Sequence, residues 1–463
     1  MTLFQAVYNL LWGDLVQIPL PGGSTLSLSL LVLILVPAGV YFTVRTRFLP
    51  FRLFPEMLRV TLENNRRPDG EALSGLQALI VSTACRVGMG NLVGVVAAIS
   101  AGGAGAVFWM WLMALLGSST AFIESTLAQL YKQKDPLYGG YRGGPAYYLH
   151  ALFVPKGSRR KHSVVAVLFA LSGLICWCGI SQVTSNSISA AFYNAFSIPP
   201  LVSTIVLVAV AAVIVLRKRA TVRVLDVMVP AMAACYFFIT LFIIVRNAGQ
   251  LPEVFSRIFA EAFGLRQAVA GGIGAVIMNG AKRGLFSNEA GSGSAPCAAA
   301  AAQVSHPAKV GLLQALGVFI DTLVICSCSA MIMLLTPAEL TDGLQGMDLL
   351  QTAMGYHLGN FGVVLIAVIL WMFSLSTFLG ILFYARSNVA YLFGDHPGAQ
   401  LAYKLLALVM LFIGGLAAYQ FVWDLGDVGV GLMTVFNMIA LFPLAPKALA
   451  ALRDYEQQYL HKS

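Results

Sequence analysis

Charged residues are scarce in this chain. Only 11% of its 463 residues are Asp, Glu, Lys or Arg, whereas soluble domains contain about 25%, and 58% are hydrophobic. So little charge cannot cover a large soluble surface, and the mean hydropathy is +0.80. The composition therefore excludes a soluble enzyme, a secreted disulfide scaffold and a disordered protein. Long apolar runs, in place of short alternating segments, indicate a helical membrane protein and not a β-barrel.

Motifs for metal sites, disulfide frameworks and membrane enzymes are also missing. The seven cysteines form no CxxC pair, and all lie in apolar stretches. The sequence has no HExxH motif and no phosphate-binding loop, and its six histidines are scattered near the ends of apolar runs. We therefore expect no enzymatic activity and no organic cofactor. A basic region followed by an apolar core and a cleavage site is absent at the N-terminus, so we expect no cleaved signal peptide.

Eleven apolar segments are long enough to cross a bilayer, which requires about 20 residues. They cover residues 25–44, 77–101, 105–131, 163–190, 199–216, 224–246, 267–303, 308–335, 361–385, 401–421 and 428–446. We interpret the seventh, which is long and interrupted, as one crossing made of two half-helices. The sequence thus predicts an all-α integral membrane protein with eleven transmembrane helices.

Basic residues fix the predicted orientation. With the N-terminus outside, the cytoplasmic stretches and their edges hold 23 of the 29 Lys and Arg residues, and the outer loops hold only Arg246, Arg257 and Arg266. Cytoplasmic loops carry such an excess of Lys and Arg. We therefore expect the N-terminus outside and the C-terminus inside. The net charge of +9 then reflects these loops, with no nucleic acid as a partner.

Two of the predicted spans combine clustered glycines with polar residues. The second contains Val87-Gly-Met-Gly-Asn91, and the seventh runs from Gly271 to Pro296 with Lys282 and Glu289 inside it. Glycine lowers helix propensity, and ionisable groups are costly at this depth. Unwound backbone is tolerated in a membrane only where protein buries it or water lines it. Both spans are therefore predicted to be broken helices.

The two predicted breaks lie five spans apart, so the broken helices run in opposite directions. Discontinuous helices at corresponding places in inverted halves are typical of secondary transporters with a site near the bilayer midplane. We therefore predict an extra helix before a 5+5 inverted repeat. The predicted parts are an N-terminal helix and loop (1–76), a first repeat (77–246), an external loop (247–266), a second repeat (267–446) and a cytoplasmic tail (447–463).

Five segments resemble the sodium:alanine symporters, also called the alanine or glycine:cation symporter family. The strings containing Phe-Trp-Met-Trp and Phe-Ser-Asn-Glu-Ala-Gly are specific, and the similarity extends over essentially the whole chain. The segments are Val87–Leu92, Gly102–Gly117, Arg142–Tyr148, Arg283–Ser294 and Phe319–Cys326.

This resemblance implies a function and a fold. The family takes up alanine, glycine or a similar small neutral amino acid together with a cation, on a leucine-transporter-type 5+5 fold. It implies sodium as the coupling ion and the bacterial inner membrane as the location. Proton coupling is the alternative that we keep open, with Glu124, Glu289 or Asp321 as the carrier.

The same resemblance assigns the substrate carboxylate to the first break. Residues 87–91 look like the unwound first core helix of sodium-coupled amino-acid transporters, whose glycine-rich backbone N–H groups hold the carboxylate. Carried over, Gly88, Met89, Gly90 and Asn91 form this part of the site. An unwound glycine segment can present several N–H groups to one anion.

The implied sodium site joins the first break to span 9. Carbonyl oxygens just before the glycines, here those of Ala84 and Val87, combine with two adjacent hydroxyls. Span 9 contains Phe373-Ser-Leu-Ser-Thr377, so the resemblance assigns these hydroxyls to Ser376 and Thr377. Hydroxyl and carbonyl oxygens suit a hard cation.

The remaining expectations concern the substrate amino group and the intramembrane charges. Asn279 and Gly280, at the expected break of span 7, are candidates for the amino group, together with Gln182. Phe373 is expected to line the pocket. Arg86 and Arg283 are expected to face each other from the two breaks as parts of a gate or ion pair. Their expected partners are Glu289, Glu124 or Asp321, and the alternative for Glu289 is that it caps the backbone of the second half-helix.

Overall fold

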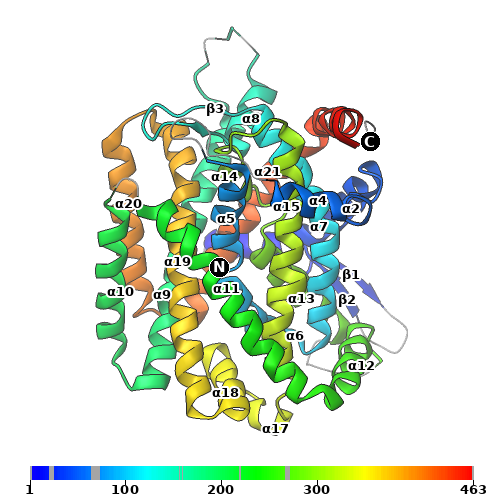
Figure 1. The fold of residues 1–463 in the computed structure, drawn as a ribbon, viewed down its shortest axis with the longest axis vertical. Helices are drawn as coiled ribbons and strands as arrows, with labels where there is room; N and C mark the ends of the chain where they lie inside the picture. The colour runs from blue at the N-terminus through cyan, green and yellow to red at the C-terminus, as the bar shows by residue number, and fades with distance from the viewer. Residues whose placement is uncertain are drawn as a thin grey trace.

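The computed structural model describes residues 3–19, 25–63, 73–155, 157–158, 160–217, 220–265 and 272–460. Within these ranges the chain is mostly helical (Figure 1). Seven helices are long and apolar enough to cross a membrane, and a pair bent by 46° makes an eighth such span. Arg266, residues 64–72 of the first predicted cytoplasmic loop and residues 267–271 of the seventh segment lie outside the described residues.

Each of the eleven apolar segments coincides with one helix or with helices joined at a break. In chain order they are α2 (Leu30–Arg45), α5 (Gly75–Arg86) with the π-helix η1 (Gly90–Gly94) and α6 (Val95–Gly102), α7 (Gly105–Leu130), α9 (Val164–Phe196), α10 (Pro200–Val215), α11 (Ala220–Arg246), α13 (Gly272–Asn288) with α14 (Ala295–Ala299), α15 (Pro307–Val318) with the π-helix η3 (Phe319–Cys326) and α16 (Ser327–Leu334), α19 (Asn360–Phe393), α20 (Pro397–Gly414) and α21 (Tyr419–Tyr455).

The first apolar segment begins later than predicted. Residues 25–28 form strand β2 (Thr25–Leu28), which pairs antiparallel with β1 (Val16–Pro19), and the helix starts only at Leu30. The Ser29 side chain caps this helix by accepting a hydrogen bond from the N–H of Val32 at 3.3 Å. The apolar run alone therefore placed the start of this helix five residues too early.

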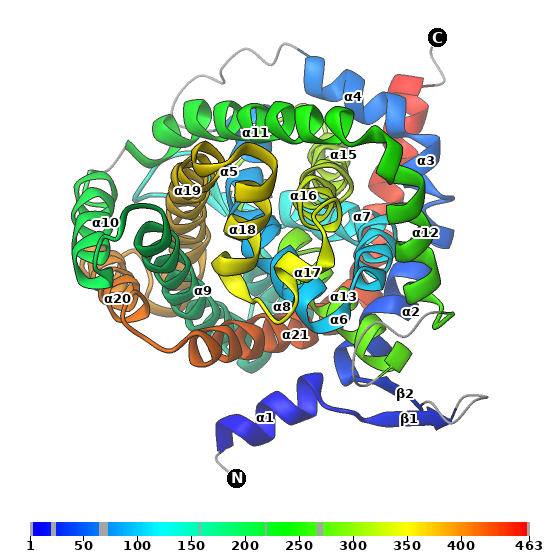
Figure 2. The same cartoon turned by 90° about the horizontal axis from the view of Figure 1, so that it is seen from below.

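Short elements connect the long helices. They are α1 (Leu3–Trp12), α3 (Leu49–Arg52), α4 (Phe54–Leu62), β3 (Gln133–Lys134), β4 (Tyr141–Arg142), α8 (Pro145–Phe153), the 3-10 helix η2 (Ala248–Gln250), α12 (Leu251–Ala262), α17 (Ala338–Thr341), α18 (Gly346–Leu358) and the π-helix η4 (Glu456–Leu460). In Figure 1, α12, α17 and α18 lie at one end of the helix bundle and β3, α8 and α14 at the other. Figure 2 shows α1 outside the main body, beside α21 and α2, which it contacts.

Contacts between the long helices occur in matched pairs. Helix α7 packs against α13, and its equivalent α15 packs against α5. Likewise α9 packs against α21 and α20, while α19 packs against α11 and α10. Helices α7 and α15, α9 and α19, and α10 and α20 also contact each other. The helices of residues 75–246 and those of residues 272–455 therefore pack against each other through several pairs.

Candidate functional site

The first break lies where the glycine cluster predicts it. Helix α5 ends at Arg86, and the chain bends before it continues as η1 and α6. The N–H of Gly88 donates to Asn91 Oδ1 at 3.0 Å, so this side chain satisfies one backbone donor of the unwound segment. A Cβ on residue 88 would lie 1.9 Å from Thr377 Oγ1. Glycine is therefore required here by the close approach of α19.

The second break lies between Asn288 and Ala295. Glu289 has a φ of 56°, and Gly291 and Gly293 have φ values of 89° and 84°. A non-glycine residue in the left-handed region costs of order 1–3 kcal/mol and persists only where its surroundings impose it. The chain therefore places strain at this break, between α13 and α14.

The expectation that Asn279 and Gly280 lie at this break is wrong. Both are inside the continuous helix α13. Asn279 Nδ2 donates to the carbonyl oxygens of Ala275 at 2.9 Å and Ala101 at 3.3 Å. A Cβ on residue 280 would lie 2.5 Å from Trp109 Cβ, so Gly280 permits close packing of α13 on α7. The structure does not bring these two residues to the other predicted substrate contacts.

Three of the four predicted sodium ligands lie together. Ser376 Oγ is 3.2 Å from the Ala84 carbonyl oxygen and donates to the Phe373 carbonyl oxygen at 2.8 Å. Thr377 Oγ1 also donates to the Phe373 oxygen, at 2.9 Å, and accepts from the Met89 N–H at 3.2 Å. The Ser376 hydroxyl has one hydrogen, so it can donate to only one of these two carbonyl oxygens at a time. These oxygens suit a small cation.

Val87 and Met89 complete the first break. Both are buried, and the Val87 N–H donates to the Thr83 carbonyl oxygen at 2.6 Å. The Met89 N–H, which was expected to hold the substrate carboxylate, is directed at Thr377 in this structure. Gly90 lies against the second broken helix, since a Cβ there would be 3.3 Å from Ser287 Cα. The two broken helices therefore touch at this level.

Asp321 belongs to a buried hydrogen-bond network between the two broken helices. Its Oδ1 accepts from Asn91 Nδ2 at 2.7 Å, and its Oδ2 accepts from Ser287 Oγ at 2.9 Å and Thr322 Oγ1 at 2.8 Å. Asn91 lies in the π-helix η1, and Asp321 lies in the π-helix η3. Such π-helical turns often occur at functional sites. The sequence did not identify Ser287 and Thr322 as site residues. The available indications were that Ser287 lies in a glycine-rich segment and that Thr322 follows Asp321.

We expect Asp321→Ala to lower the initial rate of amino-acid uptake at least tenfold. The change removes the carboxylate acceptor of the Ser287 and Thr322 hydroxyls and one of two acceptors of Asn91 Nδ2. Each unsatisfied buried group costs about 1–3 kcal/mol. Asp321→Asn retains one acceptor oxygen and is expected to be milder. Uptake by reconstituted protein, normalised to correctly folded protein on gel filtration, measures the effect. Equal rates for Asp321→Ala and the unmodified chain would contradict the role of this network.

Arg86 of α5 and Glu124 of α7 are fully buried. Arg86 Nη1 donates to the Gln314 carbonyl oxygen at 3.1 Å. Glu124 Oε1 accepts from the Gly291 N–H at 3.3 Å, and its Oε2 accepts from Asn437 Nδ2 at 2.9 Å. Glu124 therefore holds the second break through its backbone.

Glu289 and Arg283 do not pair with each other. Glu289 Oε2 accepts from Tyr384 OH at 3.5 Å. Arg283 instead forms a two-pronged ion pair with Asp427 of α21, with Nη1–Oδ1 and Nη2–Oδ2 distances of 3.1 and 3.2 Å. The hypothesis that Arg283 faces Glu289, Glu124 or Asp321 is therefore wrong. Asp427 was missed because its partner is 144 residues away in sequence.

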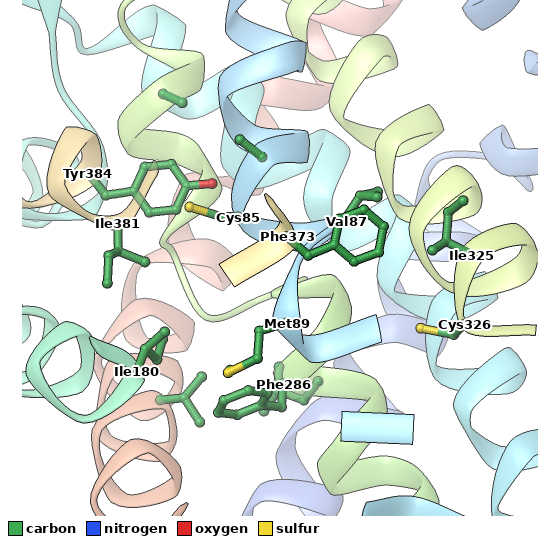
Figure 3. Packing of buried hydrophobic residues seen from close by; sticks show 14 of the residues in the cluster. Cys85, Val87, Met89, Ile180, Phe286, Ile325, Cys326, Phe373, Ile381 and Tyr384 are labelled. Carbon is green, nitrogen blue, oxygen red and sulfur yellow. The ribbon is translucent and has the colours of Figure 1, made fainter. Parts of the chain in front are cut away.

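Apolar side chains line the region between the breaks. Figure 3 shows Met89 between Ile180 of α9 and Phe286 of α13, with Phe373 nearby. Phe373 is fully buried, with its ring centroid 5.7 Å from that of Tyr236.

Gln182 points away from this region. Its Nε2 lies 3.1 Å from Met410 Sδ on α20, and Oε1 has no hydrogen-bond partner among the described residues. Thr184, two residues later on α9, is the residue that reaches the break, with Oγ1 3.8 Å from Met89 Sδ. Positions 180 and 184 share one helix face, whereas 182 does not. That spacing was the available signal for Thr184.

Comparison with known proteins identifies relatives along nearly the entire chain. The model of the sodium:alanine symporter family matches residues 21–463. The probable sodium/glutamine symporter GlnT of Bacillus subtilis is 41% identical, covering 93% of this chain and 88% of its own. The putative sodium/proton-dependent alanine carrier protein YrbD of the same organism is also 41% identical, with coverages of 92% and 90%.

Solved structures share the fold at low identity. A crystal structure of a point mutant of the Eremococcus coleocola manganese transporter has a TM-score of 0.52 at 14% identity, covering 86% of this chain and 80% of the transporter. This similarity shows that the helices are arranged as in a membrane transporter. It carries no information about the ligand.

Proposed function

The chain belongs to the sodium:alanine symporter family, and from this premise we propose that it imports alanine, glycine or a similar small neutral amino acid together with sodium. Cation-coupled amino-acid symport is the activity of this family, so the chain is a multi-pass membrane transporter and not an enzyme. The finer assignment concerns sodium, the small substrate and the inner membrane of a bacterium. The observation that carries it is the meeting of Ala84, Ser376 and Thr377 at the first break.

The proposed mechanism is alternating access between two inverted five-helix halves. The matched contacts of α7 with α13 and of α15 with α5 support the repeat, and the distribution of Lys and Arg supports an external N-terminus and a cytoplasmic C-terminus. One sodium ion crossing ~100 mV releases about 2.3 kcal/mol, which supports roughly 50-fold accumulation. The coupling cation would be held by α5 and α19 together, so that its binding links the two five-helix halves.

Packing favours a small substrate. The carboxylate of the substrate would lie against the backbone of Gly88–Asn91. The substrate side chain would lie among Met89, Ile180 and Phe286. The Met89 thioether already occupies this space and contacts Thr184. Alanine or glycine therefore fits this proposal better than glutamine, the substrate in the name of the Bacillus subtilis relative GlnT.

Uptake into proteoliposomes tests the proposal. Labelled L-alanine is expected to accumulate saturably under an inward sodium gradient, and unlabelled glycine is expected to suppress this uptake. A matched potassium gradient is the control. Absence of uptake by folded protein for alanine, glycine and glutamine alike would contradict the proposed substrate class.

Proton coupling is the second candidate function. Two observations favour testing it: the acids Glu124, Glu289 and Asp321 are buried, and the relative YrbD is named as a putative sodium/proton-dependent alanine carrier. Under this alternative, an inward proton gradient without sodium drives alanine uptake. Neutralising one of the three acids would then abolish the proton-driven uptake.

A further inference from the structure

Two cationic side chains and one carboxylate lie together between α13 and α21. Lys282 Nζ is 2.6 Å from Asp427 Oδ2, and Arg283 contacts both oxygens of the same carboxylate. The side chains are 8%, 10% and 1% exposed, respectively. No site described above uses Lys282, although the chain keeps this ammonium group almost completely buried.

The contacts of this cluster point to a second anion. The ion pairs that the structure gives Lys282 and Arg283 both end on Asp427, so two cations share one carboxylate. Arg283 Nε is also buried and has no hydrogen-bond partner among the described residues. A buried charge is costly unless it is paired and fully hydrogen-bonded. One further carboxylate would satisfy both the surplus charge and the free N–H group.

Aromatic side chains enclose the cluster. Lys282 Nζ donates to Tyr8 OH at 2.6 Å and lies 5.3 Å from the centroid of the Trp12 ring. The Arg283 guanidinium carbon lies 4.3 Å from the centroid of the Trp423 ring. Such surroundings lower the local dielectric and strengthen interactions with an anion. They also place tryptophan rings beside both cations.

The cluster adjoins the region between the breaks. Phe286 follows Arg283 by three residues, so the two share a face of α13. Its ring centroid is 5.0 Å from that of Trp423, and Figure 3 places Phe286 beside Met89. Three helical residues, about 4.5 Å along the axis, therefore separate Arg283 from the level of Phe286.

We propose that Lys282 and Arg283 form a carboxylate-binding subsite that holds an amino acid before it reaches the backbone of Gly88–Asn91. The natural ligand, an amino-acid carboxylate, rests on the proposed function. An incoming carboxylate takes over contacts that Asp427 makes in this structure. Because Asp427 belongs to α21 and both cations belong to α13, this exchange loosens α21 from α13.

Propionate is a suitable probe, since it has the carboxylate and carbon skeleton of alanine but no amino group. Titrating propionate into the full-length detergent-solubilised protein, without sodium, is expected to change tryptophan fluorescence saturably. Lys282→Gln is expected to raise the apparent Kd at least tenfold. Lys309→Gln is the matched control, because Lys309 is a buried lysine that pairs with Glu63 and lies 4.8 Å from the Tyr459 ring centroid.

Two further measurements make the result decisive. Trp423→Phe is expected to remove most of the fluorescence response, and neutral propionamide is expected to cause none. Should Lys282→Gln fail to fold, Arg283→Lys retains the charge but loses the two-pronged geometry, and it is expected to raise the Kd as well. An unchanged Kd in the folded variants, or an equal response to propionamide, would overturn the subsite. Propionate binding without any amino-acid uptake would leave the subsite intact and refute the proposed function.

Discussion

Replacing Gly88 by alanine is expected to lower the initial rate of sodium-driven alanine uptake by roughly 5- to 150-fold. The added Cβ would lie 1.9 Å from Thr377 Oγ1 and 3.0 Å from the Cys85 carbonyl oxygen. Overpacking of a filled interior costs typically 1–3 kcal/mol, which corresponds to that range of rates. The clash also moves Thr377 away from the Met89 N–H, so the expected damage falls on the cation and substrate contacts together.

Gly94→Ala provides the matched control for this variant. Gly94 ends η1 in the same broken span, and no atom lies within 4 Å of a Cβ placed there. We expect its uptake rate to remain within about twofold of the unmodified chain, since the methyl group meets open space. Measurements on both variants at equal reconstituted protein separate a local clash from a general intolerance of the break. Unimpaired uptake by Gly88→Ala would refute the tight packing of α19 on the first break.

Apolar length and glycine content predicted most of the helical architecture. A transmembrane helix must satisfy its backbone internally, so long apolar runs have essentially one helical solution. The eleven predicted segments accordingly coincide with helices. Their limits were less predictable: α21 continues to Tyr455 as one helix, through most of a stretch predicted as a tail. Pro443 and Pro446 lie within it without ending it.

The second break shows why glycine alone is ambiguous. Gly280 and Gly291 look alike in sequence, yet Gly280 lets α7 approach closely, whereas Gly291 adopts a φ of 89° in the unwound segment. The left-handed conformation of Glu289 has no compositional signal at all, because only the surrounding packing enforces it. The break was therefore predicted in the right helix but too early in it.

Pairing between distant helices was the least predictable feature. The glycine cluster predicted the first break, whereas its link to Ser376 and Thr377 came only from the family resemblance, and the structure brings these residues together. The partner of Arg283 depends on how α21 packs against α13, and nothing near residue 283 in sequence indicates Asp427. Local patterns predict elements, whereas ion pairs between elements require their arrangement in space.

Removing the two hydroxyls on α19 is expected to weaken sodium dependence most strongly. In the double variant with Ser376→Ala and Thr377→Val, two oxygens are lost while side-chain volume is nearly retained. Interactions of a polar group with a charge contribute about 1.5–3 kcal/mol each, so the sodium concentration for half-maximal uptake should rise at least tenfold for each lost ligand. Valine matches the shape of threonine and therefore preserves its packing against Gly88.

The response to saturating sodium distinguishes cation binding from structural damage in this variant. If the hydroxyls bind sodium, the maximal rate recovers as sodium rises, because the lost contacts weaken affinity and leave the pathway intact. Ser374→Ala is the matched control: Ser374 lies on the same helix, is fully buried and has no hydrogen-bond partner for its Oγ among the described residues. Its sodium dependence should be unchanged. An unaltered half-maximal sodium concentration in the double variant would remove the sodium site from α19 and would make Glu124, Glu289 and Asp321 the next residues to test for proton coupling.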